Sequence, residues 1–261
     1  MIERPYYLNQ LLRAKDTDFI KIITGIRRSG KSTLLEMLKK HLLTQGVPEN
    51  HVIHISYEQI PWFPLEKAET LYAYIKEHIT EPAHRYYLLI DEVQELEEWA
   101  KVINGLKATF PLDIYITGSN SRLFSGEYLT YITGRYIEIK VYPLSLSEFM
   151  TFRGYDESNV AKAFNEYLTI GSFPAAAVAK DPELTEIINS GLFNLSDNYR
   201  KKFLYDNGAQ IKDFIYAMPY DCVSAQGMLY GRFRTFRKID QGSPTGYYNG
   251  LMKKSCAGIW A

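Results

Sequence analysis

Eight residues near the amino terminus, Gly25-Ile-Arg-Arg-Ser-Gly-Lys-Ser32, have the types and spacing that bind a phosphate group. They fit G-x-x-x-x-G-K-S/T, the P-loop or Walker A pattern. Its two glycines let the backbone turn tightly and approach an anion without a Cβ in the way, so the loop amides can point at a phosphate. Lys31 is expected to reach the β- and γ-phosphates of a nucleotide, and the Ser32 hydroxyl to ligate Mg²⁺. The predicted nucleotide contacts are Gly25, Arg28, Ser29, Gly30, Lys31, Ser32 and Thr33.

A second pattern supplies acidic groups. Residues 86–91 are apolar except for the closing Asp91, and Glu92 follows directly, which is the Walker B form. Asp91 is expected to hold Mg²⁺ opposite Ser32, directly or through water. Glu92 is then placed to polarise an attacking water, an arrangement typical of hydrolysis rather than of transfer to another substrate. The alternative for Glu92 is a surface acid at the end of a strand.

A polar segment, Thr117-Gly-Ser-Asn-Ser-Arg122, follows another predicted strand. We expect this strand to lie between the P-loop strand and the Walker B strand, as in additional-strand P-loop ATPases. Ser119 or Asn120 at its tip would then face the γ-phosphate and the attacking water. The alternative is a turn built by Gly118 and Asn120.

Phosphoryl transfer also requires positive charge near the developing negative charge, commonly from an arginine. Arg122 and Arg135 are the candidates, and Arg135 is the one we prefer. It could act within its own subunit or in the site of a neighbouring subunit, which would require a homo-oligomer. The alternative for Arg135 is a surface salt bridge.

The segments around these motifs predict the elements that position them. Apolar runs rich in β-branched and aromatic residues predict strands at 18–24, 50–56, 86–91, 113–117 and 136–141. Leucines at helical spacing predict a helix over 31–43, and similar patterns predict helices over 7–13, 65–79 and 96–108. Strands that alternate with helices indicate an α/β fold with a parallel sheet covered on both faces.

Composition narrows the functional classes. The chain has 261 residues, is 46% hydrophobic and carries no formal net charge, so it is not a general polyanion binder as a whole. Its two cysteines, Cys222 and Cys256, form no C-x-x-C pair and predict neither a disulfide scaffold nor a zinc site. We find no signal-peptide core and no apolar run near 20 residues, so we expect a cytoplasmic protein that does not cross a membrane.

Seven segments together resemble the prokaryotic AAA+ ATP-binding proteins, relatives of the archaeal-ATPase and STAND-type P-loop groups. They are Arg4-Pro-Tyr-Tyr-Leu8, the P-loop through Thr33, Leu89-Ile-Asp-Glu-Val-Gln94, Thr117-Gly-Ser-Asn-Ser121, Thr133-Gly-Arg-Tyr136, Tyr142-Pro-Leu-Ser-Leu-Ser-Glu-Phe149 and Gly171-Ser-Phe-Pro174. The resemblance implies a P-loop NTPase sheet of order 5-1-4-3-2 between helices, with ATP and Mg²⁺ as cofactors. It also implies a helical lid opened by residues 143–149, and it places Arg4 and Tyr6 near the adenine.

The predicted organisation has three parts: an AAA+ P-loop ATPase core at 1–143, a helical lid at 144–186 and a tail at 187–261. The family usually continues with a winged-helix domain and a nuclease-like α/β domain, and this tail shows neither pattern. We therefore expect a tail that is divergent, truncated or translated out of frame. From residue 199 onward it holds ten Lys/Arg against four Asp/Glu, so a divergent tail could touch nucleic acid.

Together these observations predict Mg²⁺-dependent ATP binding and hydrolysis, with the nucleotide state driving a conformational change. The alternative is a nucleotide-gated switch that binds DNA or a protein and turns over little ATP by itself. Both hypotheses use the same site.

Overall fold

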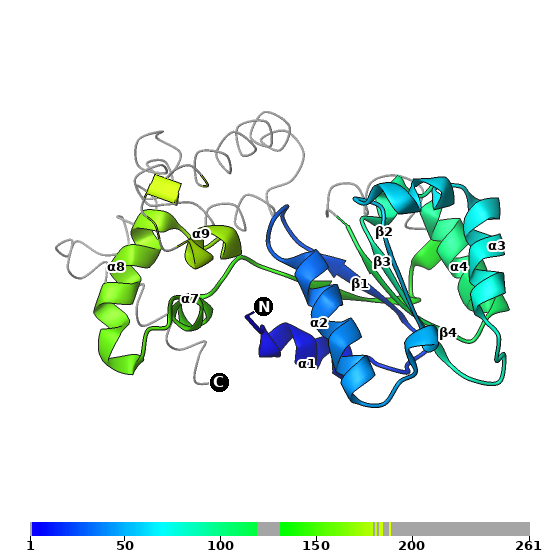
Figure 1. Cartoon of the computed structure of the whole chain (residues 1–261), viewed down its shortest axis with the longest axis horizontal. Coiled ribbons are helices and arrows are strands. Elements are labelled where there is room, and N and C mark those ends of the chain that lie inside the picture. Colours follow the sequence, from blue (N-terminus) through cyan, green and yellow to red (C-terminus); the bar gives the residue numbers. More distant parts are fainter. Residues whose placement is uncertain (1, 119–130, 180, 182, 185–187, 189–261) are drawn as a thin grey trace. The chain divides into compact units, whose positions relative to one another are not determined.

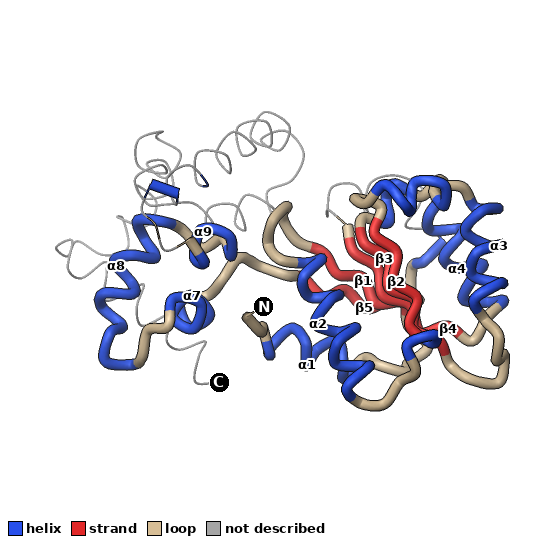
Figure 2. The backbone as a smooth tube through the Cα atoms, in the orientation of Figure 1, coloured by secondary structure: helices blue, strands red, loops and turns tan. Residues whose placement is uncertain are grey.

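The computed structural model describes residues 2–118, 131–179, 181, 183, 184 and 188. Five parallel strands form one sheet in the order β2-β3-β4-β1-β5 (Figure 2). The strands are β1 (Ile20–Thr24), β2 (Val52–Ser56), β3 (Tyr86–Asp91), β4 (Leu112–Thr117) and β5 (Tyr136–Lys140). This order confirms the predicted P-loop NTPase topology, because β4 lies between the P-loop strand β1 and the Walker B strand β3.

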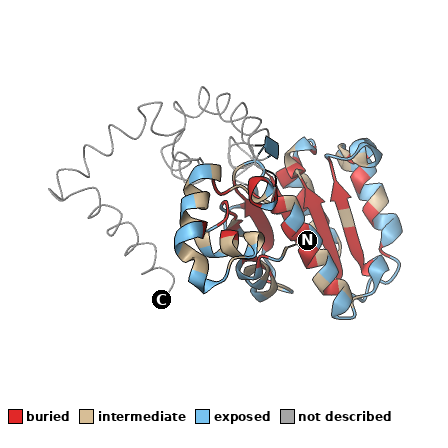
Figure 3. Cartoon of the chain, turned by 60° about the vertical axis from the view of Figure 1, so that its left-hand side comes forward, coloured by how far each residue is buried: buried red, intermediate tan, exposed pale blue. Residues whose placement is uncertain are grey.

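Helices cover both faces of the sheet (Figure 1). The core helices are α1 (Pro5–Arg13), α2 (Lys31–Thr44), α3 (Ala68–His78) and α4 (Trp99–Thr109). One hydrophobic cluster joins Ile23 of β1 to leucines of α1 and α2. The other joins Ile20 and Ile22 of the same strand to apolar residues of α3 and α4. Successive β1 residues therefore point into opposite cores. The strands β1, β3 and β4 are buried at every position (Figure 3), whereas the edge strand β5 is only partly buried.

Two predicted helix boundaries are wrong. The helix expected over 65–79 is α3, but it begins only at Ala68, because a 3-10 helix, η2 (Ile60–Leu65), precedes it. Proline residues at 61 and 64 restrict the backbone of that 3-10 helix and remove two of its amide donors. The helix expected from residue 96 begins at Trp99, since Glu98 takes a left-handed conformation with φ of 48°. The remaining 3-10 helices are η1 (Glu49–His51), η3 (Val93–Glu95) and η4 (Glu157–Asn159).

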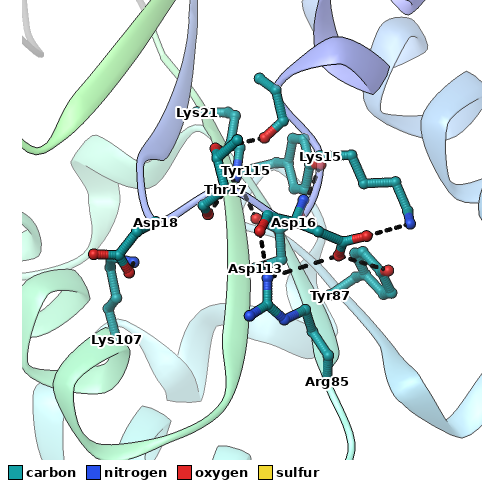
Figure 4. A network of polar contacts seen from close by, with 11 residues as sticks. Lys15, Asp16, Thr17, Asp18, Lys21, Arg85, Tyr87, Lys107, Asp113 and Tyr115 are labelled. Atoms are coloured by element: carbon teal, nitrogen blue, oxygen red, sulfur yellow. Dashed lines mark hydrogen bonds and ion pairs between the residues drawn. The ribbon is translucent and has the colours of Figure 1, made fainter.

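A polar network lies at the amino-terminal ends of the central strands (Figure 4). Lys21 of β1 and Asp113 of β4 form a fully buried ion pair through Asp113 Oδ1. The second oxygen, Oδ2, accepts from the backbone N–H of Asp16 at 2.9 Å and from the Tyr115 hydroxyl at 3.0 Å. Lys21 Nζ also donates to the Thr17 carbonyl at 3.2 Å. The network thus fastens the loop between α1 and β1 to the sheet.

Residues 144–179, which we call the lid segment, follow the last strand. The segment contains α7 (Leu146–Arg153), α8 (Val160–Ile170) and α9 (Pro174–Val178). Ser145 and Glu148 form a capping box at the start of α7, and Gly154 ends that helix in a left-handed conformation. Leu144, Phe149 and Ala177 form a small core of their own.

Within the described part of the chain, no helix has the length and apolarity needed to cross a membrane. The tail assigned to 187–261 lies, apart from residue 188, outside the described residues. The two boundaries between the three predicted parts stay predictions.

Candidate functional site

The predicted motifs meet at the carboxyl-terminal edge of the sheet. The P-loop begins directly after Thr24 at the end of β1, and Asp91 closes β3. Both strands pair in parallel with β4, which ends at Thr117 between them. Ligands of open α/β sheets bind at this edge, so the fold brings the two motifs to one place.

Backbone geometry explains the first glycine of the loop. Gly25 has φ of 147°, and a Cβ built on it would lie 2.2 Å from the carbonyl oxygen of Val141. A side chain at this position would therefore collide with the chain that leads into the lid segment. Arg28 and Gly30 also have positive φ values, of 66° and 97°, and Gly30 precedes the first residue of α2. Of these three residues, Arg28 is the unusual one, because it carries a Cβ, and residues with a Cβ rarely adopt a positive φ.

Lys31 is buried on the first turn of α2, and its Nζ donates to the Ile26 carbonyl at 3.3 Å. Burial lowers the pKa of Lys31, and the nearby carboxylates of Glu92 and Asp91 oppose that shift. The lysine and the two acids are therefore within electrostatic range of one another. Ser32, the next residue, is half-buried on the same turn, and Thr33 is exposed.

The Walker B carboxylate is held from the neighbouring strand. The hydroxyl of Thr117 donates to Asp91 Oδ1 and accepts the backbone N–H of Glu92 at 3.0 Å. Ser56 at the end of β2 lies 3.5 Å from Asp91 Oδ2. Glu92 has φ of 54°, and its side chain accepts from the Gln94 amide. A single hydroxyl thus fixes both acidic residues.

Thr117 is a site residue whose role the sequence does not reveal. A threonine at the end of a β-rich run is expected from strand propensity alone. Its position next to Asp91 depends on the strand order, which puts β4 beside β3. The sequence therefore indicates the role of Thr117 only indirectly. Thr117 is a hydroxyl residue at the last position of the strand that is expected to lie between the two motifs.

Glu58 is a further acid near the site that the motifs do not identify. Burial raises the pKa of Glu58, and the negative charges of Asp91 and Glu92 raise it further. Arg27 and Lys31 act in the opposite direction. Glu58 follows β2 by two residues, so it projects from the same edge of the sheet as the two motifs. A third carboxylate is thus electrostatically coupled to the pair.

Arg135 is not brought to the P-loop of its own subunit. It precedes β5, and its carbonyl accepts the backbone N–H of Ile20, the first residue of β1. The five residues of β1 separate it from the loop, a distance of about 16 Å at 3.3 Å per residue. Its exposed guanidinium donates to Asn104 Oδ1 at 3.0 Å. Ser119, Asn120 and Arg122 lie outside the described residues.

The fold and the site define a P-loop NTPase of the AAA type. A family model described as an AAA domain matches residues 17–150, just over half of the chain. The chain belongs to this family, and the resemblance drawn from the seven segments is confirmed.

Two curated relatives carry no assigned activity in their names. An uncharacterized protein of Haemophilus influenzae is 42% identical over 196 residues, which cover 74% of this chain and 49% of the relative. An uncharacterized protein of Methanocaldococcus jannaschii is 27% identical over 184 residues, or 65% of this chain and 38% of the relative. The chain thus spans less than half the length of either relative.

A solved structure, that of the Walker-type ATPase PABY2304 of Pyrococcus abyssi, shares the fold with a TM-score of 0.50 and 16% identity. The match covers 78% of this chain and 77% of that structure. At this level of identity the likeness bears on the fold alone.

Proposed function

We propose that the protein binds ATP with Mg²⁺ and hydrolyses its β–γ phosphoanhydride bond. The observation that carries the proposal is the convergence of Lys31, Asp91 and Glu92 beside the Gly25 loop, on one edge of the sheet. A buried lysine coupled to two adjacent carboxylates fits phosphate binding together with activation of water.

Each residue has a defined part. Lys31 neutralises charge on the β- and γ-phosphates, and the loop amides bind the same groups. Mg²⁺ is commonly held by one or two protein oxygens together with substrate phosphates, and the oxygens of Ser32 and Asp91 form such a set. When bound, the ion neutralises the charge of the phosphate oxygens. Glu92 accepts a proton from the attacking water, while Thr117 fixes the backbone from which Glu92 projects.

Two further parts of the proposal involve residues that the site geometry does not supply directly. Ser119 or Asn120 orients the attacking water. Arg135, exposed at the far end of the sheet, stabilises the transition state in the site of a neighbouring subunit. This second assignment requires at least transient self-association when ATP is hydrolysed.

Steady-state turnover tests the proposal with three variants. Glu92→Gln should lower turnover by about 10²–10⁴-fold, the usual contribution of a general base, and should retain nucleotide binding. Lys31→Ala should lose binding. Glu97→Gln changes an exposed acid of the same segment and should leave turnover unchanged. Full activity in Glu92→Gln would refute the assigned base.

The rate itself separates this function from a nucleotide-gated switch. Turnover of about 1 s⁻¹ or more lies in the ordinary enzyme range and supports hydrolysis as the main activity. Turnover that is orders of magnitude slower, and that DNA or a protein partner accelerates, supports the switch.

A further inference from the structure

Two sequence motifs have no part in the chemistry described above: Arg4-Pro-Tyr-Tyr-Leu8 before the first strand, and residues 142–149 after the last. In the structure they meet around the side chain of Arg4. Arg4 is only 3% exposed, although it is an arginine in the first turns of the chain. Its burial requires that the guanidinium donors be satisfied by the protein.

The guanidinium of Arg4 contacts three residues at once. Its Nε and Nη2 donate to the two carboxylate oxygens of Glu148 at 2.8 and 3.0 Å, a bidentate pair. Nη2 also donates to the Tyr142 carbonyl at 2.9 Å. Nη1 donates to the carbonyl of Ser29, inside the P-loop, at 2.9 Å. One buried cation therefore joins the nucleotide loop to the lid segment.

The rest of the amino-terminal motif holds this cation in place. The ring of Tyr7 lies 4.4 Å from the guanidinium carbon of Arg4. The hydroxyl of Tyr7 accepts the backbone N–H of Tyr142 at 3.1 Å. Pro5 occupies the first turn of α1, where its missing N–H costs no hydrogen bond. Residues 5–7 therefore restrict the position of the Arg4 side chain.

On the loop side, the contact acts on a phosphate-binding amide. The Ser29 carbonyl and the Gly30 N–H belong to the same peptide group. A charged donor on the carbonyl polarises that group and makes its N–H a stronger donor. Pro174 of the lid segment lies near Gly30 as well, since a Cβ built on Gly30 would be 3.9 Å from both Arg4 Nη1 and Pro174 Cγ.

On the lid side, the contact acts on the start of α7. Glu148 Oε2 accepts the backbone N–H of Ser145 at 2.9 Å, while the Ser145 hydroxyl accepts the backbone N–H of Glu148 at 3.2 Å. The carboxylate that completes this capping box is the one that Arg4 binds. The docking of α7 and the conformation of the P-loop therefore share one ion pair.

We propose that Arg4 is a positioning residue that couples phosphate binding at the P-loop to the docking of α7. The inference rests on the proposed function, because it concerns the same nucleotide site. Coupling between two sites is reciprocal: a docked α7 raises nucleotide affinity, and bound nucleotide holds α7 more firmly. The Glu148 carboxylate accepts hydrogen bonds from Arg4 and from the Ser145 N–H. A change at Glu148 should therefore alter nucleotide binding through Arg4.

Two variants test this coupling, and a third serves as a matched control. Arg4→Lys keeps the charge but cannot form the three-way fork. Glu148→Gln removes the charge that Arg4 binds and alters no residue of the P-loop. Glu166→Gln alters a second Arg–Glu pair, the partly buried Arg153–Glu166 pair at 2.6 Å, which lies entirely within the lid segment.

The probe is the non-hydrolysable ATP analogue AMPPCP with Mg²⁺. Its dissociation constant is measured by calorimetry, and hydrogen exchange of residues 146–153 is measured with and without it. Wild type should bind the analogue and gain protection in α7. Arg4→Lys and Glu148→Gln should bind about 5–150-fold more weakly, the usual range of a coupling between sites, and should lose most of the gain in protection. Glu166→Gln should behave as wild type in both measurements.

Two results would overturn the inference. If Glu148→Gln binds the analogue as tightly as wild type and α7 gains equal protection, Arg4 is only a structural anchor. This holds whether or not Arg4→Lys folds, because Glu148→Gln is an independent test. If wild type fails to bind the analogue, the proposed function fails as well.

Discussion

Replacing Asp113 with asparagine should destabilise the protein strongly, although Asp113 lies at the opposite end of the sheet from the P-loop. Its carboxylate accepts from three groups: Lys21 Nζ, the Asp16 N–H and the Tyr115 hydroxyl. Asparagine has one acceptor oxygen and one NH₂ group, so at least one donor must face another donor. Lys21 would also remain buried without its counter-charge.

The size of the effect follows from that unpaired lysine. Removing one partner of a buried ion pair costs about 3–5 kcal/mol. Lys21 could instead lose its proton, at a similar cost. Deprotonating a lysine with an ordinary pKa near 10.4 at pH 7 takes about 4.6 kcal/mol, at 1.36 kcal/mol per pKa unit. At roughly 2–4 °C per kcal/mol for a chain near this size, Tm should fall by about 6–20 °C.

The loss of stability in Asp113→Asn should also depend on pH. Burial lowers the pKa of Lys21, and the Asp113 carboxylate opposes that shift. Without the carboxylate the pKa falls further, so the unfolded chain binds more protons than the folded chain over a wider range. Stability then rises with pH in that range, and the gap between variant and wild type should narrow as pH increases from 7 toward about 10.

Thermal and urea unfolding at several pH values measure both effects. The matched control is Asp18→Asn, which breaks an Asp–Lys pair with Lys107 at 2.7 Å in the same region (Figure 4). Asp18 is fully exposed, so Tm should change little. A loss below about 1 kcal/mol in Asp113→Asn, or a deficit that grows with pH, would refute the reasoning.

Two further variants probe the site. Gly25→Ala places a methyl group against the Val141 carbonyl at a φ of 147°. We expect the variant to be destabilised by about 1–3 kcal/mol and to lose nucleotide binding. A nucleotide affinity equal to that of wild type, measured by calorimetry, would contradict this. Thr117→Val removes the hydroxyl that links Asp91 to the Glu92 N–H. Leaving that partly buried N–H without its partner should cost about 1 kcal/mol and should lower kcat more than it raises KM. An unchanged kcat in steady-state assays would show that the link is dispensable.

The sheet could be predicted from the sequence because its signals are local. Apolar β-branched runs mark the five strands, and the order follows once the P-loop and the Walker B acids are assigned to an additional-strand ATPase. The same is true of Lys31 and Asp91, whose positions follow from motif spacing and from the shared edge of a parallel sheet.

The partners of isolated charged residues could not be predicted. Lys21 interrupts an otherwise apolar run and gives no sign of its pairing with Asp113, 92 residues away. Arg4 and Glu148 are 144 residues apart. Each belongs to a sequence motif, but neither motif indicates that the two residues contact each other. Such pairs are selected by tertiary packing, which decides which buried charges can meet.

Thermal unfolding with and without Mg-ATP, on wild type and on Lys31→Ala, tests the central claim most directly. A ligand at 100 times its dissociation constant adds about 2.7 kcal/mol of stability, which corresponds to a Tm rise of about 5–11 °C. We predict this rise in wild type and its absence in Lys31→Ala. An unchanged Tm in wild type, or an equal rise in the variant, would contradict nucleotide binding at the P-loop.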